Sequence, residues 1–191
     1  IILGIKNVNT KYFSIFNADG SFDPYELNGM YNKIKDNSLD ILFASRYKKN
    51  SSSEDDTLVT FFGNKVFTLI GKILFKLPIT DILYTFVMGD TQKILNLELQ
   101  QKDFTLCVEL PINAKKDGLH MADIAANEKL RINKIYSIPF RTFFIEFSNW
   151  LLEKTSILQI QFSNLFSLDE THSIEKNIGM NIELQTVGGI I

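Results

Sequence analysis

A chain of 191 residues with a formal net charge of −2 lacks the large basic field that draws proteins onto nucleic acids, which excludes a charge-driven nucleic-acid binder. The single cysteine, Cys107, excludes an internal disulfide framework and a four-cysteine zinc site, and is typical of a reducing compartment. The length predicts one domain, or one domain with an appendage. Because the first residue is Ile, we expect a fragment whose true start lies upstream.

Apolar periodicity, caps and chain breakers predict the elements in order along the chain. They are a helix end at 1–9, a strand at 12–16, a helix at 23–36, a strand at 40–45, an exposed polar loop at 48–56, a helix at 58–75, a strand at 84–88, helices at 91–99 and 104–116, a strand at 119–126 and a helix at 139–152. No run of about 18 uncharged apolar residues occurs, so no membrane-spanning helix is expected.

Three of these elements rest on particular residues. Asp23 and Pro24 predict a helix start, with Asp as the cap and Pro in the first turn. The helix at 58–75 is amphipathic, with apolar residues at near-helical spacing at positions 62, 66, 69, 70, 73 and 74. Pro111 is expected to kink the helix at 104–116, because proline removes a backbone donor.

Strands that alternate with helices predict an α/β fold, a mostly parallel sheet flanked by helices. In such a sheet the ligand crevice lies beyond the carboxyl ends of the strands. Asn17 and Asp19 follow the first predicted strand and are placed at such an end.

Two interpretations of Asn17-Ala18-Asp19-Gly20 are open from these residues alone. Asn, Asp and Gly tolerate turn geometry and hydrogen-bond within it, which favours an ordinary turn. In an extended segment the side chains of Asn17 and Asp19 point the same way, so they could instead hold a hard cation between them.

An ordered set of motifs carries a family resemblance: Asn-Ala-Asp-Gly-Ser-Phe-Asp-Pro at 17–24, Ala-Ser-Arg-Tyr at 44–47, Gly-Asn-Lys at 63–65, Thr-Asp at 80–81 and Glu128 to Arg131. In this order the chain resembles family 2 glycosyltransferases of the GT-A fold, specifically the branch of dolichyl-phosphate mannose synthase and bacterial polyprenyl-phosphate sugar transferases. The resemblance runs from about residue 3 to about residue 150 and omits the family's N-terminal half-domain. It implies a partial, Rossmann-like GT-A domain at 1–154 with a C-terminal amphipathic helix, and a tail of unknown role at 155–191.

The resemblance implies a metal site. Asn17-Ala18-Asp19 occupies the place of the family's Asp-X-Asp motif, with the first Asp replaced. Asp19, assisted by Asn17, would then bind Mg²⁺ or Mn²⁺, which stabilises the departing nucleoside diphosphate. Losing one carboxylate weakens the attraction for the cation, although the donor's phosphates supply anionic ligands as well.

The resemblance also gives roles to residues farther along the chain. Arg46 would bind a phosphate of the donor or of a lipid acceptor, and Asp81 would face the acceptor as a general base or a positioning group. Arg131 would hold the donor diphosphate, and Lys134 could replace the lysine that the family carries later in its closing loop. The alternatives are a solvated Arg46 at a strand end and a helix cap at Asp81.

The segment 139–152 carries a heavy apolar load. Its spacing allows a helix that lies on a bilayer, or one that packs in the core. On the first interpretation the membrane contacts would be Phe140, Phe143, Phe144 and Trp150.

The expected function is therefore an inverting, metal-assisted transfer of a sugar from a nucleotide-sugar donor to a polyprenyl phosphate or another glycan-building acceptor. Such an enzyme would work in cell-envelope glycan biosynthesis, in the cytoplasm at a membrane face, without nucleic acid. A degenerate domain that binds a nucleotide, glycan or partner without turnover is the alternative, and a scaffold without a ligand is a third.

Overall fold

The computed structural model describes residues 1–101, 104–132 and 148–149. The chain divides into two compact units, Ile1–Ser148 and Asn149–Ile191, and the described residues lie almost entirely in the first. Most of the helix predicted at 139–152 lies outside the described residues. The same is true of five predicted site residues, Lys134, Phe140, Phe143, Phe144 and Trp150.

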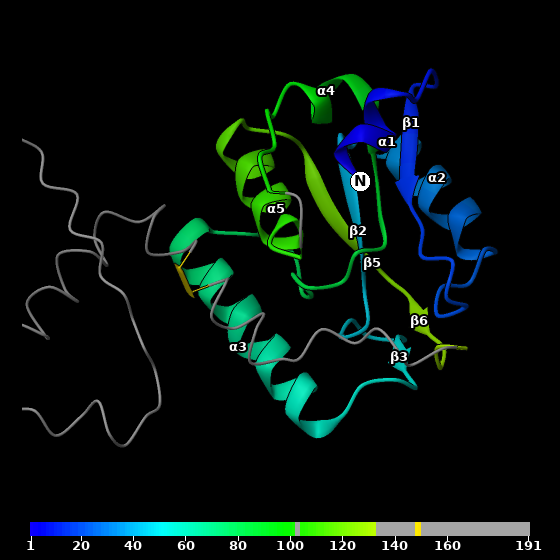
Figure 1. Ribbon diagram of the computed structural model, residues 1–191, viewed down its shortest axis with the longest axis vertical. Coiled ribbons are helices and arrows are strands. Elements are labelled where there is room, and N and C mark those ends of the chain that lie inside the picture. The colour runs from blue at the N-terminus through cyan, green and yellow to red at the C-terminus, as the bar shows by residue number, and fades with distance from the viewer. Residues whose placement is uncertain (102–103, 133–147, 150–191) are drawn as a thin grey trace, which may run out of the picture. The chain divides into compact units, whose positions relative to one another are not determined.

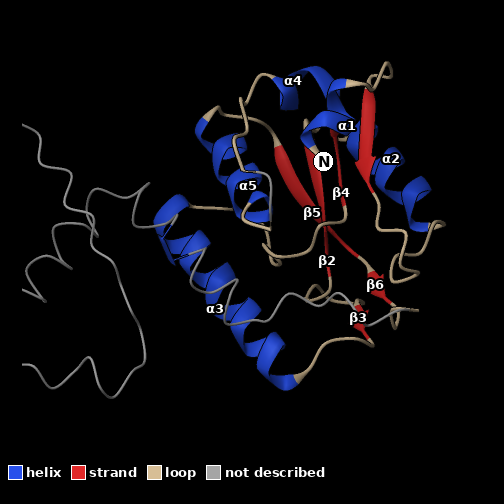
Figure 2. Cartoon of the chain, viewed as in Figure 1, coloured by secondary structure: helices blue, strands red, loops and turns tan. Residues whose placement is uncertain are grey.

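The predicted alternation of helices and strands is confirmed through residue 128, but the strand predicted at 84–88 lies at Val87–Asp90 (Figure 1 and Figure 2). The helices are α1 (Ile2–Lys6), α2 (Glu26–Asp36), α3 (Leu58–Phe75), α4 (Thr91–Leu95) and α5 (Leu106–Lys116). The strands are β1 (Tyr12–Ile15), β2 (Ile41–Ser45), β3 (Ser52–Ser53), β4 (Val87–Asp90), β5 (Met121–Ala125) and β6 (Asn127–Glu128).

The main sheet has four strands in the order β1-β4-β2-β5. Strand β4 pairs antiparallel with both β1 and β2, whereas β2 pairs in parallel with β5. Three strands therefore run in one direction, as predicted, and β4 runs against them between β1 and β2. The carboxyl ends of β1, β2 and β5 consequently lie at the same end of the sheet. A short parallel pair, β3 with β6, lies beyond that end.

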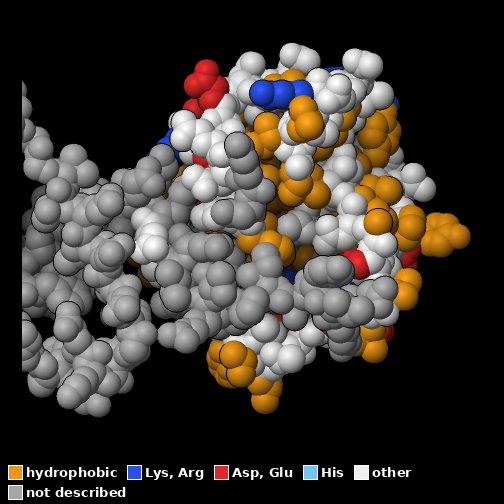
Figure 3. All heavy atoms as spheres, viewed as in Figure 1, with side chains coloured by type: hydrophobic (Ala, Val, Ile, Leu, Met, Phe, Trp, Pro, Cys, Tyr) orange, Lys and Arg blue, Asp and Glu red, His pale blue; other side chains and the backbone are white. Residues whose placement is uncertain are grey.

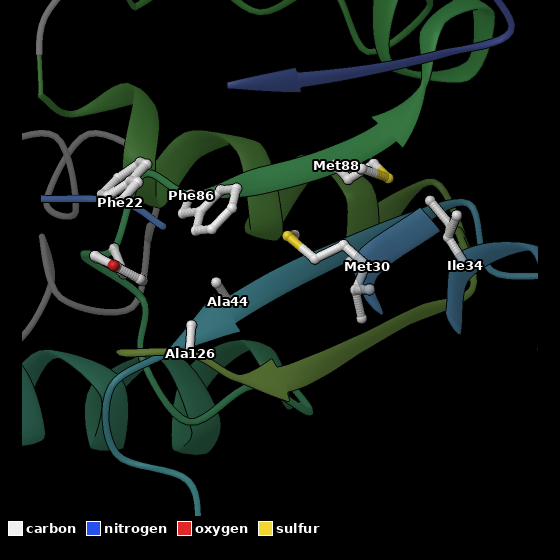
Figure 4. Close-up of a cluster of buried hydrophobic side chains, with 9 residues drawn as sticks. Phe22, Met30, Ile34, Ala44, Phe86, Met88 and Ala126 are labelled. Carbon is white, nitrogen blue, oxygen red and sulfur yellow. The ribbon is translucent and has the colours of Figure 1, made fainter. Parts of the chain in front are cut away.

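The core on one face of the sheet is built by α2. Met30 and Ile34 of this helix pack against Ala44 of β2 and Met88 of β4 (Figure 4). The alternation of β2 explains this placement, because every second residue of a strand faces the same side. Strand β2 is buried along its whole length.

The other face of the sheet lies toward α1 and α4. A Cβ added at Gly89 of β4 would lie 3.1 Å from Ile94 of α4 and 3.3 Å from Phe13 of β1. The close approach explains why a residue without a side chain stands at this point. α1 packs in turn on α4.

Helix α3 matches its predicted bounds, but most of its predicted apolar stripe points outward. Thr57 caps it by accepting a hydrogen bond from the Thr60 amide, and Lys76 ends it in the left-handed conformation at φ 53°. Its buried residues are Asn64, Phe67, Thr68 and Gly71, whereas most of the predicted apolar stripe is exposed. By length and composition alone, α3 is also the one helix among the described residues that could cross a membrane.

Some expectations are corrected. Residues 82–86 form bends and irregular chain before β4, so the helix cap considered for Asp81 is wrong. Helix α4 ends at Leu95 rather than at 99, because Asn96 already closes the turn. The predicted loop at 48–56 contains β3, and its Lys48 and Asp56 are partly buried in polar contacts rather than exposed.

Candidate functional site

The chain turns immediately after β1, as its Asn-Ala-Asp-Gly sequence predicts. One carboxylate oxygen of Asp19, Oδ1, accepts hydrogen bonds from the Ser21 amide at 3.0 Å and the Ser21 hydroxyl at 2.6 Å. Gly20 has φ +82°, in the region that favours glycine. The turn interpretation is confirmed. The bonds from Ser21 use only Oδ1, so the second carboxylate oxygen, Oδ2, takes no part in them.

Residues 129–132 lie directly on this turn. The Lys129 amide donates to the Ser21 carbonyl and the Ile132 amide to the Asp19 carbonyl, both at 2.9 Å. These bonds bring Arg131 beside Asp19, with 3.9 Å between its Nε and Asp19 Oδ2. Two predicted site residues that are far apart in the sequence are thus adjacent in space.

Arg131 lies between two carboxylates. Its Nε is 3.0 Å from Asp55 Oδ2, yet this buried nitrogen makes no well-aligned hydrogen bond within the described part of the chain. The Arg131 side chain is still 32% exposed. Because a third of the side chain reaches solvent, the guanidinium can turn toward an anion that binds at the surface.

Asp19 is held in its charged form. Partial burial would raise its pKa, but the hydrogen bonds from Ser21 and the charge of Arg131 outweigh burial, so the pKa of Asp19 lies below its usual value. A carboxylate that stays ionised in the neutral range is suited to a cation.

The side-chain oxygens of Asp19 and Asn17 can supply part of a metal site. The Asn17 side-chain amide donates to the Thr85 hydroxyl at 3.4 Å, so its oxygen is not used in that bond. Across the described residues, no cluster of three or more His, Cys, Asp or Glu side chains could hold a metal. Asp19 and Asn17 fit a hard cation only if phosphate or water oxygens complete its shell.

Arg46 and Asp81 form a second, buried cluster at the end of β2. Arg46 donates to Asp81 through Nε at 2.7 Å, Nη2 at 3.0 Å and its backbone amide at 3.2 Å. Its third guanidinium nitrogen, Nη1, donates to Glu128 Oε2 at 3.3 Å. Glu128 in turn accepts from the Ser53 hydroxyl at 2.5 Å, which ties β6 to β3.

Burial makes the Arg46 cluster a structural unit. The side chains of Arg46, Asp81 and Glu128 are 9%, 0% and 4% exposed. Burial would lower the pKa of Arg46, but the charge and hydrogen bonds of Asp81 outweigh it and raise the pKa well above its usual value. The guanidinium also lies over the Tyr84 ring, 4.6 Å from its centroid.

This geometry bears on the roles predicted for Arg46 and Asp81. Both oxygens of Asp81 accept from Arg46, so the carboxylate could face an acceptor only after that pair opens. The solvated alternative for Arg46 is wrong, because its side chain is buried and paired. The phosphate and base roles stay predictions.

Asp123 of β5 anchors a third group of polar residues. It accepts from the Thr80 amide at 2.8 Å and from the Thr80 hydroxyl at 2.5 Å, and it pairs with Lys48. Burial would raise its pKa, but these bonds outweigh it and lower the pKa below the usual value. Asp123 thus fixes the residue that precedes Asp81.

Sequence reasoning missed Asp55, Glu128 and Asp123 as partners of the predicted site. Each lies in a segment distant from the residue that it contacts, and no spacing rule connects them. A signal did exist for Glu128, because an arginine at the end of a fully buried strand requires a buried counter-charge.

Comparison with known proteins supports one family. Residues 1–95 match the family model described as Glycosyl transferase family 2, a range just under half of the chain. The match includes Asn17, Asp19, Arg46 and Asp81, but not Arg131. No curated protein matches the sequence. The mixed α/β architecture with a sheet flanked by helices agrees with the predicted partial GT-A fold, and the match over residues 1–95 supports a family 2 glycosyltransferase.

Proposed function

We propose that the protein transfers a sugar from a nucleotide-diphosphate donor to a polyprenyl phosphate or another glycan-building acceptor. The observation that carries the proposal is the meeting of Asp19 and Arg131 at the end of β1. A carboxylate that binds a cation and an arginine that binds a phosphate are the two groups that a departing diphosphate needs.

The reaction assigns a separate task to each group. An acceptor oxygen attacks the anomeric carbon of the sugar, the bond from that carbon to the diphosphate breaks, and the nucleoside diphosphate leaves with the electron pair. Attack from the opposite side inverts the anomeric centre. Asp19, with Asn17, would hold Mg²⁺ or Mn²⁺, and the cation would stabilise the charge on the leaving phosphates. Arg131 would leave Asp55 and bind the same phosphates.

Asp81 and Arg46 have a positioning role in this proposal. A phosphate acceptor is already ionised and needs no general base. The buried Arg46 pairs would hold the ends of β2 and β6 together, and the segment that follows β6 carries Arg131. The Asp81 carboxylate would act as a base only with a hydroxyl acceptor, which must lose a proton.

Release of nucleoside diphosphate tests the proposal. The protein is incubated with uridine- and guanosine-diphosphate sugars, a short-chain polyprenyl phosphate and Mn²⁺. Asp19→Asn is the most informative variant, because it removes the negative charge while its amide oxygen can still accept the hydrogen bonds from Ser21. We expect metal-dependent release that Asp19→Asn abolishes. Unchanged release in Asp19→Asn would overturn the metal assignment.

A domain that binds a nucleotide without turnover is the second candidate. The replaced carboxylate at Asn17 and the pairing of Arg131 with Asp55 favour it. Metal-dependent donor binding, with no transfer to a polyprenyl phosphate or to a glycan acceptor, would support this candidate over the first.

A further inference from the structure

The outward face of α3 is apolar along its whole length. We call Leu58, Phe62, Val66, Leu69 and Ile73 the outer stripe, and each of these side chains is more than half exposed. Their spacing of four, four, three and four residues places them on one side of the helix. Hydrophobic side chains reach the surface at the lower end of α3 in Figure 3.

The buried side of α3 is the less apolar one. It presents Asn64, Phe67, Thr68 and Gly71 to the domain, and α3 packs there against α5. The Thr68 hydroxyl accepts from the Ile82 amide at 3.3 Å, and the Asn64 amide donates to the Tyr47 hydroxyl at 2.6 Å. These contacts hold the helix in one rotational setting, so the outer stripe cannot turn inward.

Positive charge accompanies the stripe. α3 contains no Asp or Glu. Lys65 follows Phe62 by three residues and Lys72 follows Leu69 by three, which puts both lysines along one edge of the stripe. Lys65 lies over the Tyr47 ring, 4.5 Å from its centroid, whereas Lys72 is exposed.

The stripe ends at a basic hollow between α3 and α5. Its volume is about 340 Å³, and its lining combines apolar and basic side chains, which are Leu74, Phe75, Lys76, Ile112, Lys115 and Lys116. The Lys116 ammonium lies 5.8 Å from the centroid of the Phe75 ring. Within the described ranges of the chain, no acidic side chain lines the hollow.

We propose that the outer stripe of α3 lies in the headgroup region of an anionic lipid bilayer, with Lys72, Lys76, Lys115 and Lys116 at the lipid phosphates. An apolar face with a basic edge is the chemistry that such a surface recognises. The helix lies on the bilayer rather than across it, because its other side is packed on the domain. The proposal depends only on α3 and α5, so it stands or fails separately from the transferase activity.

Vesicle sedimentation of the full chain tests the proposal. We expect binding to vesicles of phosphatidylcholine mixed with phosphatidylglycerol, weaker binding to phosphatidylcholine alone, and a further loss in high salt. Val66→Asp should lower the partition coefficient about tenfold or more, because it places a charge in the stripe. The matched control is Leu3→Asp, which alters an exposed apolar residue of α1 and should bind as the wild type does.

Lysine variants distinguish the contribution of charge to vesicle binding from that of apolar contact. Lys115→Gln and Lys116→Gln should each weaken binding to anionic vesicles about fivefold and leave binding to neutral vesicles unchanged. All substituted positions are exposed, and an unchanged melting temperature would show that each variant is folded.

Four results would overturn the proposal. The first is the absence of vesicle binding, and the second is equal binding by Val66→Asp and the wild type. The third is a dimer that Val66→Asp dissociates, which would assign the stripe to a second copy of the chain. The fourth is slow thiol labelling of Val66→Cys, in a Cys107→Ser background and without vesicles, because the monomer's own residues would then cover the stripe.

Discussion

Two arginines of this protein pair with carboxylates in opposite ways. Arg46 is buried, makes four hydrogen bonds to Asp81 and Glu128, and lies over an aromatic ring. Arg131 is one-third exposed, and its Nε lies 3.0 Å from Asp55 and 3.9 Å from Asp19 without a well-aligned bond.

This difference in burial and bonding separates an arginine that stabilises the fold from one that can bind a ligand. A buried, fully bonded guanidinium cannot leave its partners without exposing two buried charges. A guanidinium that is one-third exposed and loosely aligned with its partners can exchange them for an anion at a smaller cost. We therefore expect Arg46 to stabilise the fold and Arg131 to serve the ligand.

The largest predicted effect comes from removing Arg46. Arg46→Met should lower the free energy of unfolding by about 3–5 kcal/mol, because Asp81 and Glu128 are then left buried and unpaired. Denaturant unfolding followed by circular dichroism measures this loss. Arg131→Met is the matched control and should cost less than about 1 kcal/mol. Similar losses in the two variants would break the distinction between the two arginines.

A smaller effect is expected at Asp123, the anchor beside the Arg46 cluster. Asp123→Asn should cost about 2 kcal/mol at neutral pH, since the amide replaces a charged acceptor of the Thr80 and Lys48 bonds. The folded pKa of Asp123 is lowered, so its contribution is present above the usual Asp pKa of about 3.9 and is lost as the pH falls through the folded value. The stabilities of the wild type and Asp123→Asn should therefore begin to converge as the pH falls below about 4, and meet only below the folded pKa. A gap that persisted in acid would rule out the charged contribution.

The smallest predicted effect on stability comes from substituting Gly20, in the turn that contains Asp19. Gly20→Ala and Gly118→Ala both place a side chain at positive φ, at +82° and +72°, and each should cost about 1 kcal/mol. Only at Gly20 would the new Cβ meet another side chain, at 2.6 Å from Ile132 Cδ1. Ile132 is exposed and can move, so the two melting temperatures should differ little. Nucleoside-diphosphate affinity should fall only in Gly20→Ala, because moving Ile132 shifts the neighbouring Arg131.

Local sequence signals predicted most of the fold. The helices predicted to end at 36 and to span 58–75 have these bounds in the structure, because chain breakers and apolar periodicity act within a few residues. The antiparallel insertion of β4 could not be predicted, since strand order depends on pairing between distant segments. The side that α3 buries was also missed, because periodicity shows that a helix has two faces but not which face meets the domain.

The candidate site was predicted in part for the same reason. Asn17, Asp19 and Arg131 were predicted from the family resemblance, and the structure places Asp19 and Arg131 side by side. The partners Asp55 and Glu128 come from separate segments, and only the folded chain shows that they take up the two arginines.

Calorimetric titration of uridine and guanosine diphosphates, with and without Mn²⁺, tests the central claim that Asp19 and Arg131 form the ligand site. The wild type is compared with Asp19→Asn, which keeps the turn, and with Arg131→Met. We predict binding that Mn²⁺ strengthens, that Asp19→Asn makes independent of the metal and that Arg131→Met weakens. The account would be contradicted if Mn²⁺ did not change the affinity of the wild type, or if both variants kept the full wild-type affinity.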